Sequence, residues 1–229
     1  MLLRNLVIAG SLSALAMSCN PSSGSKDLSL KTEADSVSYG IGVNLGQNFK
    51  NQSLDEINID ILASAIKDVL NEKEMVMTEE EAGALIESYM MARFQKQADG
   101  NLEEGVAFLE KNKEREGVVT LESGLQYEII EEGTGEKPTA DDEVTTHYHG
   151  TLIDGTVFDS SVERGEPAKF PVSGVIAGWT EALQLMPKGS KWKLYVPADL
   201  GYGERGSRAI KPNSTLIFEV ELIDIHKKE

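Results

Sequence analysis

The side chains best suited to acid–base or metal chemistry lie close together in the second half of the sequence. His147 and His149 are two positions apart, so on a β-strand they would share one face. A zinc site needs further histidine, cysteine or carboxylate ligands beside such a pair. His226 is far away in the sequence and no carboxylate partner is evident, so both histidines are interpreted as surface or packing residues. No metal site is predicted.

The sequence has no pattern for covalent catalysis. No Gly-x-Ser-x-Gly segment occurs, so the nucleophile elbow of a serine hydrolase is not supported. The sequence has one cysteine, Cys19, which builds neither a disulfide framework nor a cysteine-based zinc site. No cofactor is predicted.

Aromatic residues are the other feature of the second half. An aromatic side chain on a strand, such as Phe170 or Phe218, usually serves packing when it is considered alone. Trp179 follows a glycine, and Asp159 is placed where it could cap a turn. The residues themselves therefore predict an aromatic-rich antiparallel domain and do not identify its substrate.

Segments with two-residue alternation must position these side chains. Such alternation is typical of β-strands. One short helix is predicted between these strands, and it ends before Pro187. A glycine-rich loop is expected over 198–214. The predicted fold class is α+β, with an antiparallel sheet wrapped around one short helix. The expected strands are 125–129, 144–153, 157–159, 169–172, 191–196 and 215–225, and the expected helix is 178–185.

Residues 35–116 have helical spacing instead. Apolar residues recur every four positions from Val37, a second amphipathic segment covers 61–70, and a third starts at a capping box beginning with Thr78. Asp99-Gly100 is expected to interrupt or bend the third helix. Short amphipathic helices are stabilised mainly by tertiary or partner contacts, so a dimerisation module of intertwined helices is favoured over a subdomain packed on the rest of the chain.

The start of the sequence is typical of a secreted lipoprotein. Residues 1–19 combine a basic residue, an apolar run too short to span a bilayer and a lipobox-like ending at Cys19. Cys19 is therefore predicted to be lipidated, and the alternative is an ordinary signal peptide with an incidental cysteine. Residues 20–34 begin with a small, polar stretch and are expected to form a flexible tether.

Composition excludes other classes of protein. The chain has 229 residues, of which 40% are hydrophobic, and this is a globular composition. Its formal net charge of −16 means that nucleic acid phosphates would repel it, so no nucleic acid partner is expected.

Six blocks of the second half resemble the FKBP family, and they occur in family order within residues 118–227. The first half resembles the helical dimerisation domain of the macrophage infectivity potentiator-like branch, through Ser38–Gly42 and Phe108–Lys113. The six blocks are Gly124–Tyr127 (GLQY), His147–Leu152 (HYHGTL), Gly155–Ser161 (GTVFDSS), Gly174–Trp179 (GVIAGW), Leu200–Gly203 (LGYG) and Pro212–Leu222 (PNSTLIFEVEL).

The resemblance implies a peptidyl-prolyl cis-trans isomerase domain over 117–229 and a helical dimerisation domain over 35–116. It implies a bacterial envelope protein that faces the periplasm or the cell surface, with the outer membrane favoured and a lipid anchor as the sole membrane attachment. The implied partners are proline-containing unfolded or nascent envelope polypeptides, a second copy of the chain and a macrolide inhibitor. A client-binding chaperone module with little required turnover is the alternative function.

The resemblance also implies a proline pocket with assigned roles. Trp179 would form its floor, while Tyr148, Phe158 and Phe218 would form its walls. The Ile176 N–H and the Tyr202 hydroxyl would bind substrate carbonyls, and Asp159 would polarise that end. The remaining implied lining residues are Phe170, Val175 and Ile210.

Two departures from the family pattern bear on ligand preference. Ala168 stands where many members have an aromatic wall residue, and the short loop 204–209 carries two arginines, Arg205 and Arg208. They leave peptide preference and macrolide affinity open.

Overall fold

The computed structural model describes residues 28–52, 54 and 56–228. The predicted signal peptide, Cys19 and the first part of the tether lie outside the described residues. The described chain forms two compact units, one up to Met75 and one from Val76 onward. None of its helices is both long enough and apolar enough to cross a membrane.

The first unit contains α1 (Glu33–Asn51) and α2 (Ile59–Leu70). Thr32 and Asp35 form a reciprocal capping box at the start of α1, and the Asn58 side chain accepts from two backbone N–H groups at the start of α2. Neither helix buries a residue in this chain. Most of their large apolar side chains are exposed, as expected for helices that need further contacts.

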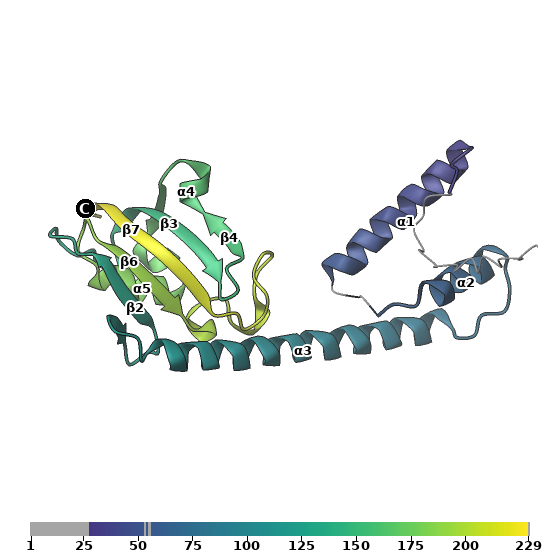
Figure 1. Cartoon of the computed structure of the whole chain (residues 1–229), viewed down its shortest axis with the longest axis horizontal. Helices are drawn as coiled ribbons and strands as arrows, with labels where there is room; N and C mark the ends of the chain where they lie inside the picture. The colour runs from purple at the N-terminus through teal and green to yellow at the C-terminus, as the bar shows by residue number, and fades with distance from the viewer. Residues whose placement is uncertain (1–27, 53, 55, 229) are drawn as a thin grey trace, which may run out of the picture. The chain divides into compact units, whose positions relative to one another are not determined.

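The second unit begins with α3 (Glu79–Asn112), whose capping box joins Thr78 and Glu81. Figure 1 shows α3 as one unbroken helix. Of the predicted interruption or bend at Asp99-Gly100, the interruption was wrong, because α3 continues through these residues. A glycine inside a helix costs only about 1 kcal/mol relative to alanine, and side chains on this part of α3 are held by contacts with the sheet domain.

A seven-stranded sheet forms the rest of the second unit, with strand order β1-β2-β6-β7-β3-β4 and β5 paired with β3. All of these pairs are antiparallel. β1 was not predicted, because its three residues are too few for an alternation signal. The strands are β1 (Val118–Thr120), β2 (Gln126–Glu131), β3 (Glu143–Leu152), β4 (Val157–Ser160), β5 (Ala168–Pro171), β6 (Lys191–Val196) and β7 (Leu216–His226).

One face of this sheet packs on α5 (Ala177–Leu185), as the α+β prediction requires (Figure 1). Leu183 of α5 and the strand residues Val144, Leu194 and Val220 are completely buried together. Alternate burial along β3 and β7 leaves the other side chains of these strands on the opposite face. The core thus lies between the sheet and α5, and the site lies at its margin.

Candidate active site

A cavity of about 630 Å³ opens between α5, the central strands and the loop that follows β6. Its volume is in the range of small-ligand sites. The structure brings all ten predicted pocket residues together in its wall. They are Tyr148, Phe158, Asp159, Phe170, Val175, Ile176, Trp179, Tyr202, Ile210 and Phe218.

Trp179 is the centre of the aromatic lining. Its ring lies nearly perpendicular to those of Tyr148, Phe170 and Phe218, with centroid separations of 5.4, 6.0 and 5.2 Å. Phe158 meets Phe218 in the same edge-to-face manner at 5.4 Å. Edge-to-face geometry is a preferred arrangement of aromatic rings, so these contacts orient the apolar lining.

Local sequence explains how these rings are positioned. Tyr148 and Phe218 point inward from neighbouring strands, β3 and β7, while Trp179 stands in the first turn of α5. Gly178 allows the close contact of this turn with the sheet, because a Cβ there would lie 2.7 Å from Cγ1 of Val196. Ile176 is the N-cap of α5 and has no side-chain capping bond.

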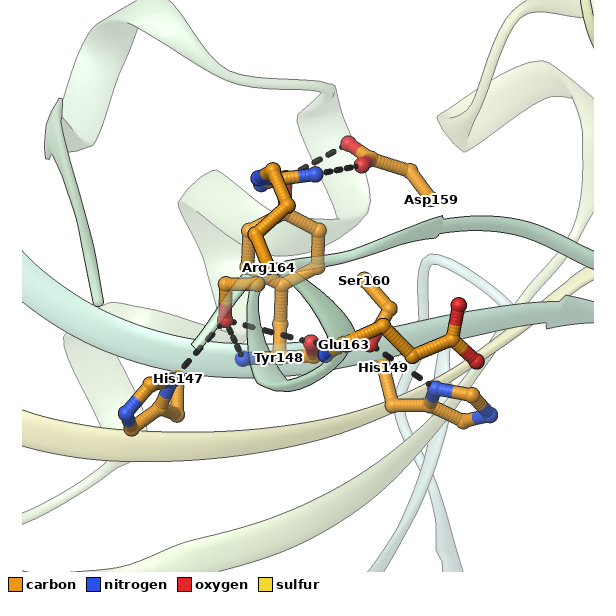
Figure 2. A network of polar contacts seen from close by, with 8 residues as sticks. His147, Tyr148, His149, Asp159, Ser160, Glu163 and Arg164 are labelled. Carbon is orange, nitrogen blue, oxygen red and sulfur yellow. Dashed lines mark hydrogen bonds and ion pairs between the residues drawn. The ribbon is translucent and has the colours of Figure 1, made fainter. Parts of the chain in front are cut away.

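The polar end of the pocket is built from three side chains (Figure 2). The Tyr148 hydroxyl donates to Asp159 at 2.5 Å, and the Arg164 guanidinium donates to the Tyr148 hydroxyl at 2.8 Å. Arg164 also forms an ion pair with Asp159 and lies over the Tyr148 ring, 5.6 Å from its centroid. The network fixes the direction of the Tyr148 hydroxyl.

These contacts shift the titration of all three groups. Burial would raise the pKa of Asp159, but its bonds with Tyr148 and Arg164 outweigh burial and lower it. Burial, and then the bond to Asp159, raises the pKa of Tyr148. The bond to Tyr148, and then the one to Asp159, raises the pKa of Arg164. At neutral pH the site therefore holds a carboxylate, a neutral phenol and a guanidinium.

A one-turn helix, α4 (Ser161–Arg164), returns Arg164 to Asp159. The Ser160 hydroxyl caps α4, and Gly165 ends it at a φ of 80° that favours glycine. Beneath Tyr148, the buried Ser161 hydroxyl accepts from the Tyr148 backbone N–H at 2.8 Å.

Each of the two histidines beside Tyr148 bonds to one of the two serines Ser160 and Ser161. His147 Nδ1 lies 3.1 Å from the Ser161 hydroxyl and His149 Nδ1 lies 3.0 Å from that of Ser160. Figure 2 shows the two rings pointing away from each other. His226 bonds to Thr145 at 2.8 Å. Within the described ranges, no three histidine, cysteine or acidic residues group in a way that could hold a metal ion.

Sequence reasoning missed five residues of the site. Arg164 was missed although Ser160 as a cap and Gly165 as a stop together indicate a one-turn helix that would bring it back to Asp159. Ala168, expected at a wall position, is not among the lining residues and packs against the core from β5. The other residues that were not assigned to the lining come from two loops, and they are Gly174, Ser207, Arg208 and Ala209. Arg208 had been linked only to ligand preference, through the loop 204–209.

Two sequence families match this chain. Residues 134–223 match the FKBP-type peptidyl-prolyl cis-trans isomerase family. Residues 34–129 match the domain amino terminal to FKBP-type peptidyl-prolyl isomerase. The two matches together cover the helices and the sheet.

Individual proteins are similar over most of their length. The outer membrane protein MIP of Legionella longbeachae is 48% identical, over 96% of this chain and 97% of that protein. The FKBP-type 22 kDa peptidyl-prolyl cis-trans isomerase of Escherichia coli K12 is 50% identical, over 82% of this chain and 94% of that protein. The crystal structure of FkpA from Escherichia coli superposes with a TM-score of 0.69 at 36% identity, covering 86% of this chain and 99% of that one.

Proposed function

Because the chain belongs to the family of FKBP-type peptidyl-prolyl cis-trans isomerases, we propose that the aromatic pocket around Trp179 is its catalytic site. The protein is a peptidyl-prolyl isomerase of the bacterial envelope that assists protein folding there. The observation that carries the site assignment is the convergence of all ten predicted residues on one cavity. The substrates are proline-containing polypeptides.

The pocket supports isomerisation without a nucleophile or a cofactor. Rotation about an X–Pro bond faces a barrier of about 18–20 kcal/mol, because resonance keeps the amide planar. The planar amide is more dipolar than the twisted one, so an apolar, water-poor environment favours the twisted state relative to water. The buried rings of Trp179, Tyr148 and Phe218 provide such an environment.

The polar groups at the pocket margin hold the flanking peptide. We assign the backbone N–H of Ile176, at the amino end of α5, and the exposed hydroxyl of Tyr202 to substrate carbonyls. Asp159, fixed by Tyr148 and Arg164, presents a negative charge at the twisting amide. Fixed partners lower the entropy cost of reaching the twisted geometry.

The finer features of attachment and assembly belong to the same proposal. Lipidation of Cys19 would tether the protein to a membrane, with the outer membrane favoured, and the helices would join two copies. Apolar side chains exposed on α2, such as Ile61 at 68% and Leu70 at 78%, support the homodimer. A macrolide is the inhibitor class that the pocket would accept.

The folding role is tested with a client protein whose slow refolding phase is limited by proline isomerisation. The purified chain should accelerate that phase, and Trp179→Ala should abolish most of the acceleration. Trp192→Ala is the matched control, because Trp192 is as buried as Trp179, at 4% exposure, but does not line the pocket.

The same experiment separates catalysis from client holding. Loss of acceleration in Trp179→Ala, with suppression of client aggregation unchanged, would place holding outside the pocket. Equal acceleration by the parent and by Trp179→Ala would contradict the site assignment.

A further inference from the structure

The middle of α3 contacts the segment Pro212–Thr215. This segment follows the loop over 203–210, which is called the pocket loop because part of it lines the cavity. Asn101 Nδ2 donates to the Pro212 carbonyl oxygen at 2.7 Å, and Asn213 Nδ2 donates back to the Ala98 carbonyl oxygen at 3.3 Å. Ala98 and Asn213 are buried, at 3% and 8% exposure. These reciprocal bonds join residues more than 100 positions apart, so they fix α3 and this segment together.

Steric fit adds to the docking one turn further along α3. Gly105 is buried, and a Cβ built on it would lie 2.3 Å from the Thr215 hydroxyl oxygen. The absence of a Cβ at Gly105 therefore lets the helix approach Thr215, just before β7, this closely without displacing the threonine side chain.

The docked segment also holds the pocket loop. The Asn213 N–H donates to the Gly203 carbonyl oxygen at 2.9 Å, which closes the base of the loop. Asn213 has a φ of 52°, a left-handed conformation that asparagine tolerates better than most residues. Within the loop, the Ser207 N–H donates to the Ile210 carbonyl oxygen at 2.7 Å. Asn213 thus bonds to α3 with its side chain and to the loop with its backbone.

This loop supplies one wall of the cavity. Its residues Ser207, Arg208, Ala209 and Ile210 line the cavity, and Tyr202 lies directly before it. We propose that Asn101 and Gly105 of α3 are positioning residues for the isomerase site, which set the place of the Ile210 and Tyr202 wall through Pro212–Thr215. The inference rests on the proposed function of the pocket and goes beyond it by including α3.

The test compares purified Asn101→Ala and Gly105→Ala with Gln95→Ala. Gln95→Ala is a matched control, because it also removes a side-chain amide from α3, but one that bonds to Asp99 on the exposed face of α3. We expect kcat/KM for an X–Pro peptide to fall about three- to tenfold in Asn101→Ala, mainly through KM, since about one net hydrogen bond is lost. We expect a fall in the same direction in Gly105→Ala and none in Gln95→Ala.

A readout independent of activity is the NMR signal of the Ile210 methyl groups and of the amides over 203–210. Both docking variants, Asn101→Ala and Gly105→Ala, should shift these signals. In Gly105→Ala the shift would not reflect a weaker helix, because alanine stabilises a helix relative to glycine. Adding Thr215→Ala to Gly105→Ala removes the 2.3 Å contact and should return the signals toward those of the parent.

Two results would overturn the inference. One is a set of loop signals that moves no more in the docking variants than in Gln95→Ala, and the other is a loop that shifts without any change in kcat/KM. A parent protein without isomerase activity would contradict the proposed function instead, while the NMR signals would still decide whether α3 positions the loop.

Discussion

Two arginines of this chain make the same kind of contact, and one of them is at the pocket. Arg164 bonds to Tyr148 and Asp159, while Arg115 bonds to Tyr195 and Glu128. We expect Arg164→Gln to lower kcat/KM by about three- to tenfold, because the Tyr148 hydroxyl loses a charged partner at a partly exposed site. Peptide cis-trans exchange rates measure this change. Arg115→Gln is the control and should leave them unaltered, whereas equal losses would show a general destabilisation.

The same substitution should change the pH dependence of the enzyme. The folded pKa of Asp159 is below its ordinary value of 3.8, so its ionised contacts are complete above that pH and are lost as the pH falls through the lowered pKa. Without Arg164, fewer partners stabilise the Asp159 carboxylate against the effect of burial, so the pKa of Asp159 rises. The acid limb of the kcat/KM profile should therefore move to higher pH in Arg164→Gln, and an unmoved limb would contradict the coupling.

The outcome for individual residues shows what sequence patterns can reach. Trp179, Tyr148 and Phe218 could be placed in one pocket through the FKBP-like blocks, each of which carries a short, recognisable spacing. Arg164 and Arg208 were not placed there, because each lies in a turn that returns an exposed side chain to the site. For Arg164 the local signal was the cap at Ser160 with the stop at Gly165. Alternation and helical spacing say little about such turns.

At the scale of elements, Gly150 near the end of β3 allows the pocket rings to pack closely. A Cβ on Gly150 would lie 2.7 Å from Phe158 and 3.0 Å from Phe218. Gly150→Ala must therefore displace both rings, and overpacking of this kind costs about 1–3 kcal/mol. We expect Gly150→Ala to have a lower free energy of unfolding, measured by urea titration, and a kcat/KM at least tenfold below that of the parent. Gly155→Ala probes the turn after β3, where a Cβ would meet nothing within 4 Å but the φ of 84° disfavours alanine, so it should lower the unfolding free energy and spare the activity. An active Gly150→Ala would contradict this packing.

A buried carboxylate joins the ends of β3 and β7. Asp142 accepts from the Thr139 N–H at 2.7 Å and from Lys227 at 3.0 Å. The hydrogen bond from Thr139 lowers the pKa of Asp142 most, and Lys227 lowers it further. Together they outweigh the effect of burial, which raises the pKa, and bring it from 3.8 to about 2. Its stabilisation is complete above the unfolded pKa and is lost as the pH falls through the folded one.

This sign gives a direct test by denaturant unfolding. The parent should be more stable than Asp142→Asn at neutral pH, and the difference should shrink between pH 3.8 and about 2. A difference that is the same at both ends of this range would contradict the role of the charge.

The elements themselves follow closely from the sequence. Strong alternation predicted β3, β6 and β7, apolar spacing predicted α1, and a capping box marked the start of α3. The continuity of α3 was not predictable from its own residues. Asp99-Gly100 weakens the helix locally, and the contacts of Ala98 and Asn101 that hold it come from a segment far away in sequence.

At the scale of the whole molecule, the exposed apolar side chains of α1 and α2 support the proposed homodimer. We expect the parent to sediment as a homodimer of 25.0 kDa chains and the double variant Ile66→Glu with Leu70→Glu to sediment as a monomer. Both side chains are exposed on one row of α2, so the fold should survive. Lys67→Glu on the same helix is the control. A variant that remains dimeric would exclude this surface as the interface.

The division of the chain was only partly accessible from the sequence. The change from helical to alternating spacing near residue 117 predicted separate domains over 35–116 and 117–229, and this division remains a prediction. In the structure the boundary between the two compact units falls between Met75 and Val76 in the sequence, and α3 belongs to the same unit as the sheet. Contacts such as the hydrogen bond of Asn101 with Pro212 join α3 to the sheet domain, and no local sequence pattern predicts them.

The central claim, isomerisation in the Trp179 pocket, is tested most directly by the cis-trans exchange rate of a short X–Pro peptide. The chain without residues 1–19 should accelerate exchange at catalytic concentration, Trp179→Ala should lose most of this acceleration, and Trp192→Ala should keep it in the fraction that folds. A folded parent that leaves the exchange rate unchanged would contradict the account, and the pocket would then be a client-binding site without turnover.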